Sequence, residues 1–207
     1  MKKMLWTAAA ILVAAAMVAA PAFAGGAKEA KPAEKFVIKM ATPSNPQDSC
    51  VKAFFHFKEI VERDSKGRVE VQVAHSGQLG GHRDYIEGLQ MGSIQIAEIN
   101  TSVLSAVDNK FMVMDMPYIS KSVDHQIKVL NAGVGDILSK ALEDKTGIKI
   151  IGWMVRTPRS VYSSRGTIAS AADFNGLKIR VMQSPVMVKT MELLGAKPIP
   201  KIGRAHV

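Results

Sequence analysis

Hydrophobic positions along the chain follow two different periods. Val69, Val71 and Val73 alternate with polar or small residues, which predicts a half-buried strand. Residues 36–41 are more continuously apolar and predict a largely buried strand. Between them, residues 45–63 carry apolar side chains at helical spacing, with cap residues before the first turn. The chain therefore begins with a strand, a helix and a second strand.

The same alternation of strands and helices continues to the end of the chain. Strands are expected where β-branched residues cluster, and helices where a cap residue precedes an apolar periodic stretch that ends at glycine. Because parallel strands need long crossovers, this pattern predicts an α/β fold with a twisted, mostly parallel sheet. The further strands expected are residues 94–100, 148–154, 159–164, 177–182 and 197–200, and the further helices are one ending at Gly92, residues 122–133, 134–147 and 184–195.

Residues 1–24 have the pattern of a secretory signal peptide. Two lysines precede an apolar run, and Ala22-Phe23-Ala24 offers small residues at the positions that a signal peptidase recognises. Cleavage after Ala24 is expected, and a retained membrane anchor is the alternative because the apolar run is nearly long enough to span a bilayer. Residues 25–35 lack a hydrophobic period and predict a disordered leader. The mature protein is expected to be exported, without stable membrane insertion.

The composition narrows the classes of ligand. The formal net charge is +9, or +7 without the two lysines of the signal peptide, which suits an anionic ligand or surface. Nucleic acid is not an expected partner, because the charges are dispersed and the signal exports the protein. A single cysteine excludes an internal disulfide, and His56, His75, His82 and His125 show no metal-ligand spacing. Neither a metal nor a cofactor is expected.

The sequence offers little for catalysis and more for anion binding. The glycine-rich stretch HSGQLGG matches neither a nucleophile elbow nor a phosphate-binding loop, and no nucleophile or acid–base pair is visible, so an enzyme is not expected. Arg180 lies near the carboxyl end of the strand at 177–182, where ligands of parallel sheets bind. Its guanidinium fork matches a carboxylate, although a surface arginine is the alternative interpretation. Arg156 and Arg159, which follow the strand at 148–154, allow the same two interpretations.

Several stretches between Lys35 and Pro200 together resemble one family. They are SGQLGGHRDYIEGLQMGSIQIA, FMVMDMPYI, SAADFNGLKIRVMQSPV and LGAKPIP, in this order. The chain resembles the DctP-type solute receptors of tripartite ATP-independent periplasmic (TRAP) transporters. The resemblance implies a periplasmic-binding-protein-like fold, in which two lobes with mostly parallel twisted sheets close on a small organic acid. It also implies a periplasmic monomer that delivers its ligand to the transporter's membrane subunits.

The resemblance also implies a set of ligand-binding residues. Arg180, in KIRV, is expected to form a salt bridge with the ligand carboxylate. A second arginine after the tryptophan-containing strand falls on Arg159 rather than Arg156, and the polar contact at the end of the strand at 94–100 falls on Asn100. Met182 stands where the family usually has proline.

The family pattern also predicts the domain organisation. Residues 36–155 are expected to form most of the first lobe, and residues 156–201 the start of a second lobe that is truncated, since family members continue beyond this point. Residues 202–207, IGRAHV, match the translation of a common sequencing adapter, ATC GGA AGA GCA CAC GTC, followed by its stop codon TGA. We therefore expect a non-native tail without function. The competing hypothesis is an exported α/β enzyme, membrane-surface protein or structural protein with an anion-binding cleft.

Overall fold

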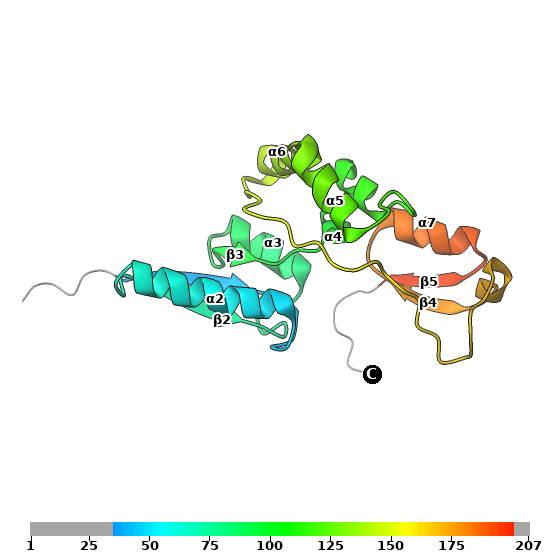
Figure 1. Ribbon diagram of the computed structural model, residues 1–207, viewed down its shortest axis with the longest axis horizontal. Helices are drawn as coiled ribbons and strands as arrows, with labels where there is room; N and C mark the ends of the chain where they lie inside the picture. The colour runs from blue at the N-terminus through cyan, green and yellow to red at the C-terminus, as the bar shows by residue number, and fades with distance from the viewer. Residues whose placement is uncertain (1–34, 201–207) are drawn as a thin grey trace, which may run out of the picture. The chain divides into compact units, whose positions relative to one another are not determined.

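The computed structural model describes residues 35–200. The predicted signal peptide, the predicted leader up to residue 34 and the predicted tail at 202–207 lie outside the described residues. The predicted α/β fold with parallel sheets is confirmed. Strands alternate with helices along the described chain, and each strand pair in it is parallel (Figure 1).

The first sheet has the strand order β2-β1-β3. β1 (Phe36–Ala41) lies in the centre and pairs along its whole length with β2 (Val69–Ala74). On its other side, only the end of β1 pairs with β3 (Ile96–Ala97). The predicted strand at 94–100 is thus too long, because β1 ends at Ala41, opposite Ala97, and Asn100 already caps the next helix.

Helix α2 (Ser49–Asp64) connects β1 to β2 and begins later than the sequence predicts. The carboxylate of Asp48 accepts a hydrogen bond from the backbone N–H of Cys50 (2.9 Å) and caps the helix. Asn45, where the predicted range of this helix begins, instead accepts from the N–H of Gln47 (3.1 Å) within a turn. Two start signals occur close together, and the one nearer the helix forms the cap.

The core of this part of the fold lies between the sheet and its helices. Cys50 and Phe54 of α2 pack against Met40 and Val71 of the sheet. Helix α3 (His82–Gln90) contributes Tyr85, which is fully buried with Ala41 and Ile94. The alternating valines therefore bury one face of the sheet, as their period predicts.

A helical region follows the first sheet. Its core cluster consists of large apolar side chains, and Phe111 at its centre is 0% exposed. The methionine-containing stretch at residues 109–115 forms a 3-10 helix. A π-helical turn containing Gly133 (φ 109°) joins the helices predicted at 122–133 and 134–147. The elements are α4 (Thr101–Leu104), η1 (Asn109–Asp115), α5 (Val123–Val129), η2 (Leu130–Val134) and α6 (Gly135–Thr146).

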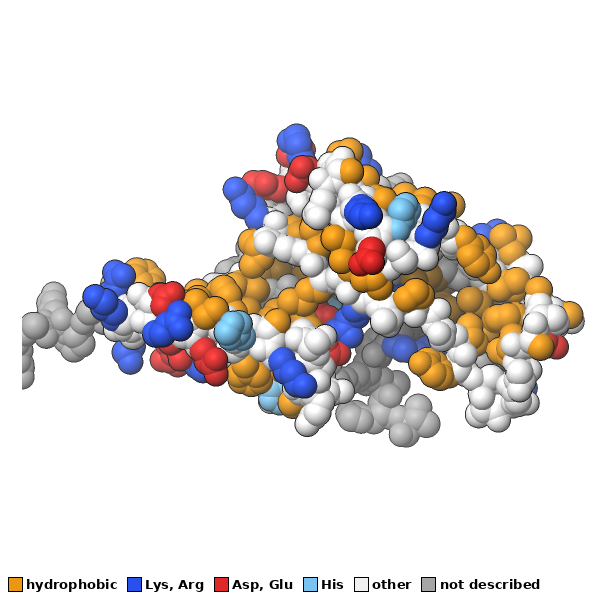
Figure 2. Space-filling view, viewed as in Figure 1, with side chains coloured by type: hydrophobic (Ala, Val, Ile, Leu, Met, Phe, Trp, Pro, Cys, Tyr) orange, Lys and Arg blue, Asp and Glu red, His pale blue; other side chains and the backbone are white. Residues whose placement is uncertain are grey.

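The second sheet pairs β4 (Lys178–Val181) with β5 (Lys197–Pro200). The 3-10 helix η3 (Ala171–Phe174) precedes it, and α7 (Pro185–Leu193) connects its strands. Burial alternates along β4, where Arg180 is exposed and Val181 is buried. Large apolar side chains are exposed around α7 and β5 (Figure 2), including Leu193 at 77%.

Two predicted strands, at 148–154 and 159–164, are wrong. Residues 148–163 contain neither helix nor strand. A strand needs a neighbour to accept its backbone hydrogen bonds, and no described segment pairs with this one. Ile148, Ile150 and Trp153 instead pack against the core of the helical region, so the spacing that predicted a strand reflects this packing. Within residues 35–200, every helix is too short or too polar to span a bilayer.

Candidate ligand-binding cleft

The structure places Asn100, Arg159 and Arg180 along one open cleft. Asn100 follows β3 and caps α4, and Arg159 lies in the irregular segment after Trp153. Arg180 lies on β4, near its carboxyl end. All three predicted residues are thus among the many that line this large cleft, and they come from three separate segments.

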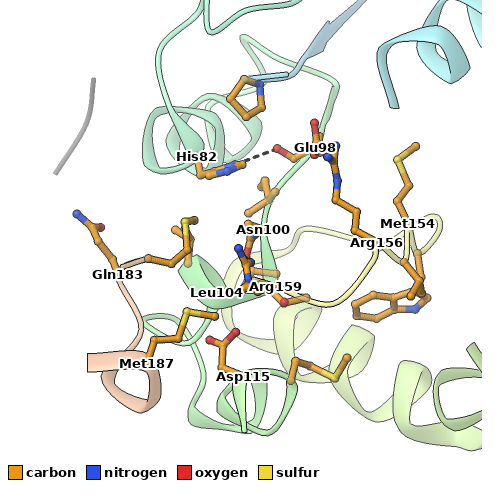
Figure 3. Close-up of a pocket in the computed structure, with 18 of the residues that line it drawn as sticks. His82, Glu98, Asn100, Leu104, Asp115, Met154, Arg156, Arg159, Gln183 and Met187 are labelled. Carbon is orange, nitrogen blue, oxygen red and sulfur yellow. Dashed lines mark hydrogen bonds and ion pairs between the residues drawn. The ribbon is translucent and has the colours of Figure 1, made fainter. Parts of the chain in front are cut away.

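Asn100 and Arg159 are in direct contact (Figure 3). Nη2 of Arg159 donates to Oδ1 of Asn100 over 3.5 Å, and the same oxygen accepts from the backbone N–H of Ser102 at 3.0 Å. No described residue accepts a hydrogen bond from the amide nitrogen of Asn100. The pair therefore presents a guanidinium and an amide donor side by side, which suits an oxygen-rich anion.

Arg180 carries an uncompensated positive charge. Its side chain is exposed, and no described residue forms an ion pair or a side-chain hydrogen bond with it. Among nearby cations, Lys189 pairs with Glu192 at 3.6 Å, whereas Lys178 and Lys197 resemble Arg180 in having no ion pair with a described residue. Arg180 is therefore available to an anion from solution.

Arg156 is held by the protein itself. Its Nη1 and Nη2 each donate to the carboxylate of Asp48 over 2.9 Å. Nη2 also lies 3.3 Å from Oε1 of Glu98 and 3.3 Å from Oγ of Ser44. We call these contacts the Arg156 bridge. Two carboxylates already neutralise this guanidinium, which supports Arg159 rather than Arg156 as the ligand-side arginine.

The bridge has clear electrostatic consequences. The hydrogen bond from Arg156 and that from the N–H of Cys50 hold the pKa of Asp48 below its ordinary value, and Asp48 in turn raises the pKa of Arg156. Burial, reinforced by the charge of Glu98, raises the pKa of the Cys50 thiol to about 12. The thiol is therefore neutral at physiological pH and unsuited to act as a nucleophile.

Other polar side chains of the cleft form hydrogen bonds within the protein. Nδ1 of His82 lies 3.2 Å from the carbonyl oxygen of Glu98 (Figure 3), so this nitrogen carries the hydrogen that is donated. Oδ1 of Asp115 accepts from Oγ of Ser102 at 2.6 Å. Apolar side chains complete the wall, including Leu104, Met154 and Met187. Apolar walls with a few placed polar groups are typical of small-molecule sites.

Sequence reasoning missed the Arg156 bridge. Arg156 is separated by 108 residues from Asp48 and by 58 from Glu98, and no local spacing links them. Asp48 lies within the helix predicted at 45–63 and Glu98 within the strand predicted at 94–100, and neither range indicates a contact with Arg156. Among residues 35–200, no group of three or more histidine, cysteine, aspartate or glutamate side chains is arranged to hold a metal ion.

Parallel α/β sheets and a cationic cleft are features of solute-binding proteins, and sequence comparison specifies the family. The chain belongs to the bacterial extracellular solute-binding proteins of family 7 (DctP), whose family profile matches residues 40–201. This is a family of solute-binding proteins rather than enzymes, as the sequence predicts.

Relatives in this family carry several names. The uncharacterized protein YiiZ of Salmonella typhimurium is 32% identical over 165 residues, which are 79% of this chain and 50% of YiiZ. The C4-dicarboxylate-binding periplasmic protein DctP of Rhodobacter capsulatus is 30% identical, over 80% of this chain and 50% of that protein. The 2,3-diketo-L-gulonate-binding periplasmic protein YiaO of Escherichia coli is 28% identical, over 79% and 49%. The chain spans about half the length of these curated relatives.

Solved structures confirm the fold. A TRAP periplasmic solute-binding protein from Sulfitobacter sp. NAS-14.1 with bound β-D-galacturonate superposes with a TM-score of 0.76 at 27% identity, covering 80% of this chain and 55% of that one. A second, from Roseobacter denitrificans with bound β-D-glucuronate, gives 0.76 at 26% identity, covering 81% and 55%. The resemblance to TRAP solute receptors inferred from the sequence is therefore confirmed.

Proposed function

We propose that this protein is an extracytoplasmic receptor that binds a small organic acid and delivers it to the membrane subunits of a TRAP transporter. The observation that carries the proposal is the uncompensated Arg180, in the same cleft as Arg159 and Asn100, in a member of this family. The ligands named for the relatives, which are C4-dicarboxylates, 2,3-diketo-L-gulonate, galacturonate and glucuronate, are all carboxylates.

In this proposal each of the three residues has a distinct role. Arg180 forms the salt bridge to the ligand carboxylate, and Arg159 donates further hydrogen bonds to the same group. Asn100 offers its amide N–H to a carboxylate or hydroxyl oxygen. Each hydrogen bond to a charged group contributes about 1.5–3 kcal/mol. Such a set of contacts supports micromolar affinity, about −8 kcal/mol.

Ligand capture in this proposal requires closure of two lobes about a hinge. We propose that residues 36–155 form most of the first lobe and that the second lobe begins at residue 156. The change from the first sheet and its helices to β4, α7 and β5 supports this boundary. The segment at 148–163, which contains no helix or strand, lies at the boundary.

We propose that the protein acts in the periplasm as a monomer after cleavage of the signal peptide. The relatives from Escherichia coli and Rhodobacter capsulatus are named as periplasmic proteins, which supports the location. Mass spectrometry of the exported protein is expected to give a chain beginning at Gly25. A chain that retains Lys2 and Lys3 would instead support an uncleaved anchor.

A thermal-shift panel tests the binding function on the native gene product, by which we mean the protein expressed from its natural gene. D-galacturonate, D-glucuronate and succinate probe the acid class, and D-galactose is a matched sugar without a carboxylate. A bound acid is expected to raise the melting temperature, because a ligand at a hundred times its Kd adds about 2.7 kcal/mol to the free energy of unfolding. D-galactose is expected to leave it unchanged. Equal stabilisation by acid and neutral sugar, or by neither, would contradict the proposal.

A further inference from the structure

We propose that Arg156 is a positioning residue, whose bridge to Asp48 and Glu98 holds Arg159 and Asn100 in place for a carboxylate ligand. The inference rests on the proposed function. It assigns to Arg156 an effect on ligand affinity that it exerts without contacting the ligand.

The segment that carries Arg159 needs an external anchor. Residues 157–163 form no helix or strand, and all of them are exposed. The side-chain partner of Arg159 in the described structure is Asn100, and their contact of 3.5 Å is at the outer limit of a hydrogen bond. Neither the local backbone nor this contact fixes the guanidinium tightly. Arg156, three residues earlier, makes the strong contacts of this segment.

The carboxylates that Arg156 contacts are themselves held by further hydrogen bonds. Asp48 caps α2 through the N–H of Cys50 at 2.9 Å. Oε2 of Glu98 accepts hydrogen bonds from the hydroxyls of Thr42 and Ser44, which follow β1. The bridge therefore ties the irregular segment to the start of a helix and to the end of the central strand. Supporting contacts of this kind determine how well a binding group is preorganised.

The bridge acts on both members of the contacting pair. Glu98 precedes Asn100 by two residues, and Arg156 precedes Arg159 by three, so the bridge joins the two segments next to their predicted ligand groups. The side chains of Asp48 and Glu98 are only 20% and 18% exposed. Without Arg156, two nearby and largely buried carboxylates would lack a counter-charge. The segment of Arg159 would also lose its contacts with Asp48 and Glu98.

Two effects of Arg156 must be separated by experiment. Loss of the bridge moves Arg159, and it also leaves two negative charges that repel an anionic ligand through space. The first effect requires Arg159, whereas the second does not. A double-mutant cycle distinguishes them, because residues that act through each other give non-additive losses.

The test is calorimetric titration of the native gene product with D-galacturonate. The wild type, Arg156→Ala, Arg159→Ala and the double variant are compared. We expect Arg156→Ala to weaken binding about tenfold when Arg159 is present and less than about twofold when it is absent, a coupling within the range found for residues in one network. An equal loss in both backgrounds would overturn the proposal, since it would show that Arg156 acts only through its charge.

Two further variants sharpen the result. Arg165→Ala removes another exposed arginine downstream, outside the cleft lining, and is expected to leave affinity unchanged. Arg156→Lys keeps the charge but cannot form the two-pronged contact with Asp48, so it is expected to lose nearly as much affinity as the alanine variant. Full affinity in the lysine variant would refute positioning by the guanidinium.

A measurement without ligand keeps this inference separate from the proposed function. A nitroxide on Ser160→Cys reports the motion of the segment, and native Cys50 stays unlabelled because it is 4% exposed and its pKa is about 12. The label is expected to become more mobile in Arg156→Ala but not in Arg165→Ala. If the label is equally mobile in Arg156→Ala and in the wild type, the positioning role of Arg156 is refuted, whether or not an acid binds. If no acid binds the wild type, only the proposed function is refuted.

If Arg156→Ala fails to fold, variants that change only one carboxylate of the Arg156 bridge can replace it in the mobility measurement. Asp48→Asn removes the charge of one carboxylate and Glu98→Gln that of the other, and each retains its shape. Each is expected to raise the mobility of the label at residue 160 by less than the loss of the whole bridge. If both variants leave that mobility at the wild-type value, the proposal is contradicted.

Discussion

Arg159 and Asn100 lie 59 residues apart in the sequence, yet Nη2 of the arginine is 3.5 Å from Oδ1 of the asparagine. The contact places a guanidinium beside an amide in the cleft that Arg180 also lines. Asn100 is fixed by its role as the cap of α4, and the segment of Arg159 is anchored by the Arg156 bridge. A cap and an ion-pair network thus set the geometry of the proposed carboxylate site.

The Asp48–Arg156 pair makes stability depend on acid pH. The pKa of Asp48 is lowered from its ordinary 3.8 by Arg156, so the folded state binds this proton less readily than the unfolded state. The stabilisation is therefore present above pH 3.8 and is lost as the pH falls through the folded pKa. Asp48→Asn is expected to be less stable than the wild type at pH 7, with the difference shrinking below about pH 4.

Urea unfolding of both proteins at pH 7 and pH 3 measures this difference. Because the variant lacks the carboxylate of Asp48, the change in this difference between the two pH values reports on the charge of Asp48 and its contact with Arg156. A gap in the free energy of unfolding that stays constant between the two pH values would show that the charge of Asp48 is unimportant for stability.

The helical region depends on Phe111. This side chain is 0% exposed and packs against Leu138 and Leu142. Phe111→Ala is expected to lower the free energy of unfolding by about 3–5 kcal/mol, because it leaves a cavity in a closely packed core. Phe36→Ala, at a site 68% exposed, is expected to cost about 1 kcal/mol or less. If chemical denaturation shows that both variants lose the same free energy of unfolding, Phe111 is not at the core of the helical region.

The turn before α3 requires glycine at position 80. Gly80 has φ +98°, and a Cβ there would collide with the carboxylate of Asp84, which accepts from the N–H of Gly81 at 2.6 Å. Gly80→Ala is expected to destabilise the protein by about 1–3 kcal/mol through backbone strain and the disturbed cap. Gly152→Ala, where the added Cβ meets nothing within 4 Å, is expected to change stability by less than about 0.5 kcal/mol. Thermal denaturation in which both variants match the wild type would contradict this account of the turn.

Sequence patterns predict the elements that are stabilised by their own cap residues or by packing against elements nearby in the sequence. β1 and β2 have the predicted bounds because their apolar faces meet α2, and α7 begins at Pro185 as its cap signal indicates. The strands expected at 148–154 and 159–164 are absent because strand formation depends on a partner, and a period of two also arises from packing against a core. Phe36 and Val37 begin the strand that is predicted to be largely buried, yet both are exposed, so an apolar pattern does not by itself show that a side chain is covered.

Some residues of the candidate site could be predicted from the sequence, and others could not. Arg180, Arg159 and Asn100 are predicted because a family resemblance marks them, and the structure places all three on one cleft. Asp48 and Glu98 could not be assigned to Arg156, since tertiary folding alone brings residues so distant in sequence together. The residues that support a binding site are therefore harder to find from sequence than those proposed to touch the ligand.

Calorimetric titration of the native gene product and its Arg180→Ala variant with D-galacturonate, or with the acid that gives the largest thermal shift, tests the central claim most directly. The wild type is expected to bind with micromolar affinity, about −8 kcal/mol. Arg180→Ala is expected to weaken binding at least about tenfold, because it removes charge-assisted hydrogen bonds worth about 1.5–3 kcal/mol each. Lys197→Ala, which removes an exposed cation from the paired strand, is the control and is expected to bind as the wild type does. Unchanged affinity in Arg180→Ala would contradict the claim that this arginine holds the carboxylate.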